Sequence, residues 1–145
     1  MCIRDSFGPG RAVFYAGNDY AMQANETILT LAMIETQKAL DNLEGILTVE
    51  GLDAVFVGPS DLGLSLGYAP GNHDEPMLLE AIETILKKVK SNGKRAGIYT
   101  FTPEYAKRMI KLGFDYVVIS SAARMLTAQA NKTLTELRSK YFFKI

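Results

Sequence analysis

The sequence predicts an α/β fold built on a parallel sheet, and two observations predict it. The 145 residues are 48% hydrophobic and 22% charged with 12 glycines, a composition typical of one globular domain. From residue 28 onward, short apolar runs rich in β-branched residues alternate with longer segments of helical period. Four such units follow one another without a linker, which is the pattern of parallel βα units.

Charge and composition exclude several classes of partner. Lys plus Arg and Asp plus Glu each number 16, so we expect neither nucleic acid nor an anionic membrane as a partner. Cys2 and His73 are the only residues of their types, which excludes an internal disulfide and a zinc site of Cys and His. No apolar run reaches the roughly 18 residues of a membrane span, and no signal peptide is recognisable. We therefore expect a soluble, cytoplasmic protein.

The first unit begins with a strand over residues 28–34, which is apolar except for Thr30 and is expected to be covered on both faces. One helix follows and ends at Glu50 and Gly51. Its apolar stripe consists of Leu40, Leu43, Ile46 and Leu47. In the second unit, a strand over 54–57 ends at Gly58 and Pro59, where a loop is expected because proline has no amide hydrogen.

The later elements have clear boundary signals. Pro76 is expected in the first turn of a helix that ends at Asn92, with an apolar stripe of Leu79, Ile82, Leu86 and Val89. Residues 96–99 form the third strand, and Thr102 caps the helix after it. Residues 116–119 form the fourth strand, and the last helix carries Leu126, Leu134 and Leu137.

Two architectures fit these units: an open doubly wound sheet, or a piece of an eight-stranded barrel, which normally needs about 250 residues. Length alone favours the open sheet. In both architectures the functional groups lie at the carboxyl ends of the strands. Glu35 directly follows the first strand and Asp61 lies just past the second, so we expect two neighbouring carboxylates that can share a hard divalent metal ion.

A plainer interpretation is that Glu35 caps the following helix and Asp61 is a turn residue. The segment Gly-Pro-Ser-Asp at 58–61 favours a site instead, because the proline directs the chain out of the sheet. The amides of Ser60 and Asp61 are then free to bind a carboxylate. A cation beside backbone donors suits a 2-keto acid, whose oxygens chelate the metal.

Three segments, residues 33–36 (Met-Ile-Glu-Thr), 39–43 and 49–62, together resemble the HpcH/HpaI aldolase family. The resemblance runs from about Gly10 to about Leu137. It implies a class II, divalent-metal-dependent aldolase, an aldehyde-lyase that cleaves a 2-keto-3-deoxy sugar acid or related 4-hydroxy-2-oxo acid to pyruvate and an aldehyde. It also implies that the chain is the C-terminal part, the last four βα units, of a TIM (β/α)8 barrel.

On this resemblance, residues 7–145 form a partial barrel domain and residues 1–6 are a non-native leader without a family counterpart. Glu35 and Asp61 match the family's metal ligands for magnesium, manganese or cobalt, and Ser60 and Asp61 match the place where the carboxylate of pyruvate docks. No catalytic residue is assigned, because the family's base histidine, its aspartate partner and the arginine that polarises the keto oxygen lie in the other half of the barrel. His73 does not match the catalytic histidine.

The sequence departs from the family pattern at Met33, where a glutamine is frequent, and at Ala122, where an aspartate is usual. Arg11 and Arg124 could reach substrate or a neighbouring subunit, but an isolated arginine on a loop or helix is more often a surface residue, so we expect both on the surface. The family's complete members are homo-oligomers, and the resemblance makes residues 125–137 a candidate subunit contact.

The leading hypothesis is a metal-dependent pyruvate aldolase that is inactive as this chain. The alternative is a non-catalytic half-barrel that binds a divalent metal and a keto acid or only associates through its sheet edges. A phosphate-binding open sheet ranks last, because the sequence has no phosphate-binding fingerprint.

Overall fold

A computed structural model describes residues 10–141, and the chain divides into two compact units, Met1–Thr30 and Leu31–Ile145. The first unit contains helices α1 (Gly10–Ala16) and α2 (Tyr20–Thr27), neither of which has a buried residue. Phe14 and Tyr15 are 81% and 77% exposed. The predicted leader, residues 1–6 with Cys2, lies outside the described residues.

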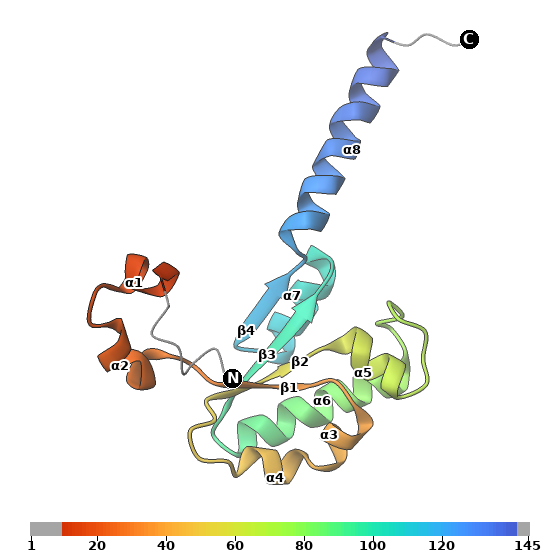
Figure 1. Ribbon diagram of the computed structural model, residues 1–145. Helices are drawn as coiled ribbons and strands as arrows, with labels where there is room; N and C mark the ends of the chain where they lie inside the picture. The colour runs from red at the N-terminus through yellow and green to blue at the C-terminus, as the bar shows by residue number, and fades with distance from the viewer. Residues whose placement is uncertain (1–9, 142–145) are drawn as a thin grey trace. The chain divides into compact units, whose positions relative to one another are not determined.

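The second unit is a four-stranded parallel sheet whose strands lie side by side in sequence order (Figure 1). The strands are β1 (Leu31–Ile34), β2 (Ala54–Val57), β3 (Arg95–Thr100) and β4 (Tyr116–Ile119). The predicted parallel α/β fold is therefore confirmed. All four carboxyl ends meet at one edge of the sheet, which we call the carboxyl rim.

The first strand is shorter than predicted. Pairing between β1 and β2 starts at Leu31 opposite Ala54, so the strand begins three residues later than predicted. Ile28 and Leu29 are accordingly 50% and 71% exposed. An apolar run alone does not form a strand where the neighbouring parallel strand has not yet begun.

Six helices alternate with the strands of this unit, and Figure 1 labels them α3 to α8. The predicted first helix is two helices, because the Asn42 side-chain amide donates to the Lys38 carbonyl oxygen at 2.7 Å and closes the end of the first one. The segment after β2, predicted as a loop, begins with a helix. The bounds are α3 (Gln37–Asp41), α4 (Leu43–Leu47), α5 (Pro59–Ser65), α6 (Pro76–Ser91), α7 (Pro103–Leu112) and α8 (Ala122–Tyr141).

One face of the sheet carries the hydrophobic core. Ile34, Val57 and Ile98 are level with one another in the register and are fully buried. Helix α6 contributes most to covering them, through Leu78, Ile82, Ile85 and Val89. Burial of such side chains contributes roughly 1.5–3 kcal/mol each before entropy is counted.

The opposite face is much less covered, so the expectation of two covered faces is wrong for this unit. Met33, Phe56, Gly97 and Tyr116 pair across the four strands on that face. Met33 and Tyr116 are 53% and 56% exposed. A Cβ on Gly97 would lie 2.7 Å from Phe56 Cδ2, so only glycine leaves room for the Phe56 ring, whose centroid is 6.0 Å from that of Tyr116. We call these four residues the open face.

The amino ends of β3 and β4 are joined by Asp115, directly before β4. Its carboxylate accepts hydrogen bonds from Lys90 Nζ at 2.6 Å and Arg95 Nη1 at 3.1 Å. It also accepts from the backbone N–H of Ala96 at 2.9 Å. Burial raises the pKa of Asp115, but these three donors outweigh it and lower the pKa to about 2.

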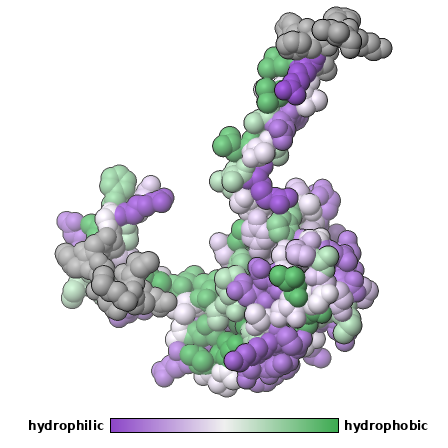
Figure 2. All heavy atoms as spheres, turned by 45° about the vertical axis from the view of Figure 1, so that its right-hand side comes forward, coloured by the Kyte–Doolittle hydropathy of each residue, from purple (hydrophilic) through white to green (hydrophobic). Residues whose placement is uncertain are grey.

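Helix α8 extends beyond the sheet (Figure 1), and its side chains from Ala122 to Arg138 are all exposed. Hydrophobic side chains show along one side of it in Figure 2. Leu126, Leu134 and Leu137 of this helix are 73%, 48% and 49% exposed. Within residues 10–141, no helix combines the length and the apolar character that crossing a membrane requires.

Candidate functional site at the carboxyl rim

The carboxyl rim brings Glu35 against the end of the neighbouring strand. Glu35 follows β1 directly, and the Gly58 N–H, directly after β2, donates to the Ile34 carbonyl oxygen at 3.3 Å. A Cβ on Gly58 would lie 3.2 Å from Glu35 Oε2 and 3.4 Å from Glu35 Cβ. The missing side chain of Gly58 therefore makes the space in which the Glu35 carboxylate lies.

Asp61 lies one strand further along the same rim, in the first turn of α5. Pro59 is the first residue of this helix, because its fixed φ suits a helix start and its missing N–H costs no hydrogen bond there. The Leu62 N–H donates to the Gly58 carbonyl oxygen at 2.9 Å and begins the i to i−4 ladder. The N–H groups of Ser60 and Asp61 precede that ladder because they lie in the first turn of the helix.

The plainer interpretation of Glu35 is wrong, because Thr36 caps helix α3. The Thr36 Oγ1 accepts from the Ala39 N–H at 3.1 Å. Asp61 is helical and exposed rather than part of a turn. None of the ion pairs found among residues 10–141 involves either carboxylate.

The carboxylates of Glu35 and Asp61 at the rim provide some, but not all, of the oxygen ligands that a hard cation needs. In the part of the chain that the structure describes, no three side chains of His, Cys, Asp or Glu form a metal-binding group. Glu35 and Asp61 provide carboxylate oxygens, and the space beside Gly58 accommodates one of these carboxylates. Magnesium needs no more from a protein than one or two carboxylates, since water and substrate oxygens complete its six ligands.

A cluster that the sequence did not predict joins this rim to the next strand. Ser60 Oγ lies 3.2 Å from His73 Nε2. The His73 ring stacks on Phe101 after β3, with centroids 4.8 Å apart, and on Tyr105 in α7, with centroids 5.4 Å apart. Burial lowers the pKa of His73 below the ordinary 6.5, while the Asp74 carboxylate opposes part of this effect. His73 is therefore mainly neutral at pH 7.

Two further side chains extend the cluster. The Arg124 guanidinium carbon lies 5.0 Å from the centroid of the Phe101 ring, a cation–π distance. The Tyr105 hydroxyl oxygen is buried without a hydrogen-bond partner among the described residues. Burial raises the pKa of Tyr105 to about 12, so this phenol stays neutral. Phe101 and Tyr105, the aromatic residues that follow β3, are the feature of the sequence from which this cluster could have been predicted.

Met33 and Ala122, the two residues that depart from the family pattern, also lie near the carboxyl rim. The Met33 Cε is 3.6 Å from the position of a Cβ on Gly58, so Met33 lies next to Glu35. A thioether is at most a weak acceptor and cannot donate a hydrogen bond to a substrate there. Ala122 is the exposed first residue of α8.

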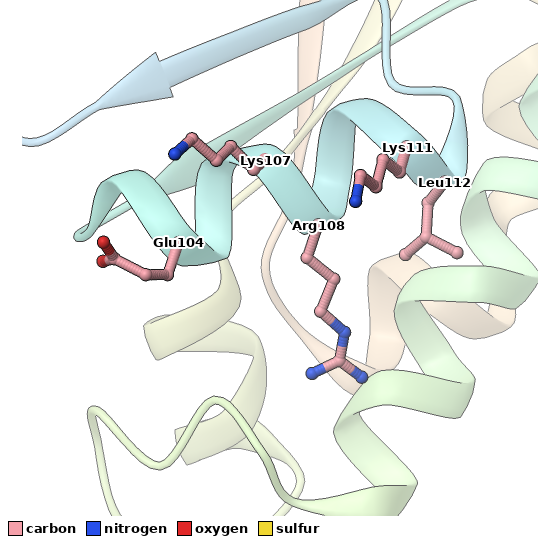
Figure 3. A pocket seen from close by; sticks show the side chains of 5 residues that line it. All are labelled: Glu104, Lys107, Arg108, Lys111 and Leu112. Carbon is pink, nitrogen blue, oxygen red and sulfur yellow. The ribbon is translucent and has the colours of Figure 1, made fainter.

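A hollow of about 560 Å³ lies on α7 (Figure 3), and neither Glu35 nor Asp61 lines it. Its lining comes from that single helix: Glu104, Lys107, Arg108, Lys111 and Leu112. In Figure 3 these side chains spread apart instead of converging on one point. Arg108 is already paired with Asp74 at 3.1 Å. This hollow has no arrangement of groups for chemistry.

A parallel sheet of βα units whose strands lie in sequence order, with acidic side chains at the carboxyl rim, is the arrangement of one part of an α/β barrel. The chain belongs to the HpcH/HpaI aldolase/citrate lyase family, whose model matches residues 4–122. The fold is therefore part of a TIM (β/α)8 barrel, as the resemblance implied.

Relatives and solved structures agree with this membership. The chain is 40% identical to a hydroxypyruvate/pyruvate aldolase of Rhizorhabdus wittichii, over 92% of this chain and 54% of the relative. It is 35% identical to a 2-keto-3-deoxy-L-rhamnonate aldolase of Escherichia coli O1:K1, over 83% of this chain and 45% of the relative. A crystal structure of a family member from Burkholderia cenocepacia J2315 matches with a TM-score of 0.76 and 28% identity, over 88% of this chain and 49% of that one. The chain thus spans about half the length of the curated relatives it matches.

Proposed function

We propose that this chain supplies the metal- and keto-acid-binding part of a metal-dependent pyruvate aldolase. The observation that carries the proposal is the placement of the Glu35 carboxylate in the space beside Gly58, with Asp61 in the first turn of the helix that follows. Family membership supports the reaction class. The substrate is a 2-keto-3-deoxy sugar acid or a related 4-hydroxy-2-oxo acid, in keeping with the names of the two relatives.

Glu35 and Asp61 would bind the divalent ion, which is magnesium, manganese or cobalt. When bound, the ion supplies positive charge beside the keto oxygen and stabilises the negative charge that develops there. The N–H groups of Ser60 and Asp61 orient the substrate carboxylate by donating to its oxygens. Because both N–H groups donate to the same substrate carboxylate, they fix the orientation of the substrate and therefore the direction in which its keto group points.

Proton transfer is assigned to groups outside this chain. His73, the one histidine, is bonded to Ser60 and stacked on aromatic rings instead of standing free at the rim. We therefore propose that this chain alone binds the metal and the keto acid without turning substrate over. The same proposal includes a partial barrel domain over residues 7–145, a cytoplasmic location and a homo-oligomeric parent protein.

A second candidate is a half-barrel that only associates through its edges. In the four-stranded sheet, β1 and β4 each have a single neighbouring strand, so both expose backbone donors and acceptors. The exposed side chains of Met33 and Tyr116 on the open face favour association as well. This candidate needs no metal.

Calorimetric titration of Mn²⁺ into the full chain, with and without saturating pyruvate, separates the two candidates. We expect the wild type to bind Mn²⁺ more tightly with pyruvate, and Glu35→Gln and Asp61→Asn to weaken binding at least about tenfold, since each removes a charged ligand. Glu104→Gln on α7 is the matched control and should bind as the wild type does. Wild-type chain that is folded by circular dichroism and binds no Mn²⁺ would contradict the proposed site.

A further inference from the structure

We infer that His73 is a positioning residue that fixes the start of α5 through the hydroxyl group of Ser60. The inference rests on the proposed function, since it concerns the helix start that carries the Ser60 and Asp61 amides. It assigns to this histidine a role in keto-acid affinity, and no role in proton transfer.

The start of α5 lacks the tether that most helices have. Gly58 is the residue that precedes the helix, and glycine has no side chain with which to cap it. Helix α5 has seven residues, too few for the helix to be stable by itself. Pro59 and Leu62 of this turn are buried, and the hydrogen bond of 3.2 Å between Ser60 Oγ and His73 Nε2 adds a polar side-chain contact to it.

The His73 ring is itself fixed, which is what makes it useful as a tether. It stacks on Phe101 with an interplanar angle of 16° and on Tyr105 with an angle of 24°. The next residue, Asp74, is paired with Arg108 of α7 at 3.1 Å. The loop that carries His73 is therefore attached to α7 both at the ring and at the following residue.

The tether thus crosses from one βα unit to the next. Phe101 and Tyr105 lie at the β3–α7 corner, whereas Ser60 lies at the β2–α5 corner. Through His73, the hydroxyl of Ser60 has a fixed direction relative to the rim. Because Asp61 is the next residue in the same turn, its backbone N–H is positioned together with that of Ser60.

Chosen variants separate the hydrogen bond from the stacking. His73→Phe keeps an aromatic ring and removes the hydrogen bond, and Ser60→Ala removes the partner of the same bond. Tyr105→Phe is the matched control, because it keeps the ring and removes a hydroxyl that has no partner in the described structure. Each variant is first checked for the wild-type circular dichroism spectrum.

The first measurement is direct, because the chain has one histidine and its ring nitrogens give a single set of NMR signals. We expect Ser60→Ala to change the ¹⁵N shifts of the His73 ring and Tyr105→Phe to leave its tautomer unchanged. Ring shifts that are the same in the wild type and in Ser60→Ala would show that the bond is absent and would overturn the inference.

The second measurement is the affinity for pyruvate of the Mn²⁺-loaded chain. We expect His73→Phe and Ser60→Ala each to weaken pyruvate binding about five- to tenfold, the typical worth of one hydrogen bond, with Mn²⁺ affinity unchanged. The double variant should be no weaker than either single variant. Ser60→Thr, which keeps the hydroxyl, should retain wild-type affinity.

The outcomes distinguish this inference from the proposed function. If the wild type binds Mn²⁺ and pyruvate but His73→Phe binds pyruvate equally well, the positioning role is wrong and the proposed function stands. If the wild type binds no pyruvate, the proposed function is wrong and the role of His73 fails with it.

Discussion

The sheet has one edge where its strands begin, which we call the amino edge, and another where they finish, the carboxyl rim. These two edges are built in opposite ways. At the amino edge, the Asp115 carboxylate accepts three hydrogen bonds, from Lys90, Arg95 and the Ala96 N–H. Nearby, Lys94 Nζ donates to the Leu52 carbonyl oxygen at 2.6 Å. Asp115 and Lys94 at this edge thus join one element to another.

At the carboxyl rim, the acidic groups are left available. No ion pair within residues 10–141 involves Glu35 or Asp61. Where polar side chains do bond, as Ser60 does with His73, they position the start of a helix. The amino edge thus contributes to stability, while the proposed binding site lies at the carboxyl rim, a division that is general for parallel βα barrels.

The largest expected effect comes from breaking the amino edge. Asp115→Ala removes three hydrogen bonds, two of them from cations, and leaves the Ala96 N–H without its acceptor. We expect the free energy of unfolding to fall by about 2–3 kcal/mol in urea titrations. Mn²⁺ affinity of the folded protein should not change, and a loss of affinity would contradict the separation of the two edges.

A smaller effect is expected from acid. The folded-state pKa of Asp115, about 2, lies below the ordinary 3.8, so its contribution is present above pH 4 and is lost as the pH falls toward 2. Comparing urea unfolding of the wild type and Asp115→Asn at pH 6 and pH 3 measures this contribution, about 1–2 kcal/mol. A difference between the two proteins that stays constant over this range would show that the carboxylate is not stabilising.

The smallest effect is expected at the carboxyl rim. Glu35→Gln and Asp61→Asn should change the free energy of unfolding by less than about 0.5 kcal/mol, because neither carboxylate forms an ion pair in the described structure. The same urea titrations measure it. A loss comparable with that of Asp115→Ala would mean that the rim carboxylates are structural.

Local signals explain what the sequence predicted well. β2 and β4 have the predicted bounds, and Pro76 and Thr102 mark the starts of α6 and α7. The Thr102 Oγ1 accepts from the Tyr105 N–H at 3.2 Å, as a helix cap does. Such signals depend only on residues that are close in the chain, so they can be recognised in a single sequence.

The errors have causes that lie outside the local sequence. The start of β1 is set by where β2 pairs, and the break at Asn42 is set by a side-chain bond that competes with the helix. The contact between Ser60 and His73 joins residues from two segments across a loop. At the site, strand order predicted that Glu35 and Asp61 follow consecutive strands, but not that the carboxylate of Glu35 lies against Gly58.

The open face affects how readily copies of the chain associate with one another in solution. Phe56 and Tyr116 lie on it, with Tyr116 56% exposed, and the chain has zero formal net charge at pH 7 and a sequence pI of about 6.6. Near that pH, no net charge repulsion opposes contact between such faces. Light scattering of concentrated samples should therefore show a maximum close to pH 6.6 that falls on either side, and buffers well away from this pH are those in which the chain should stay dispersed.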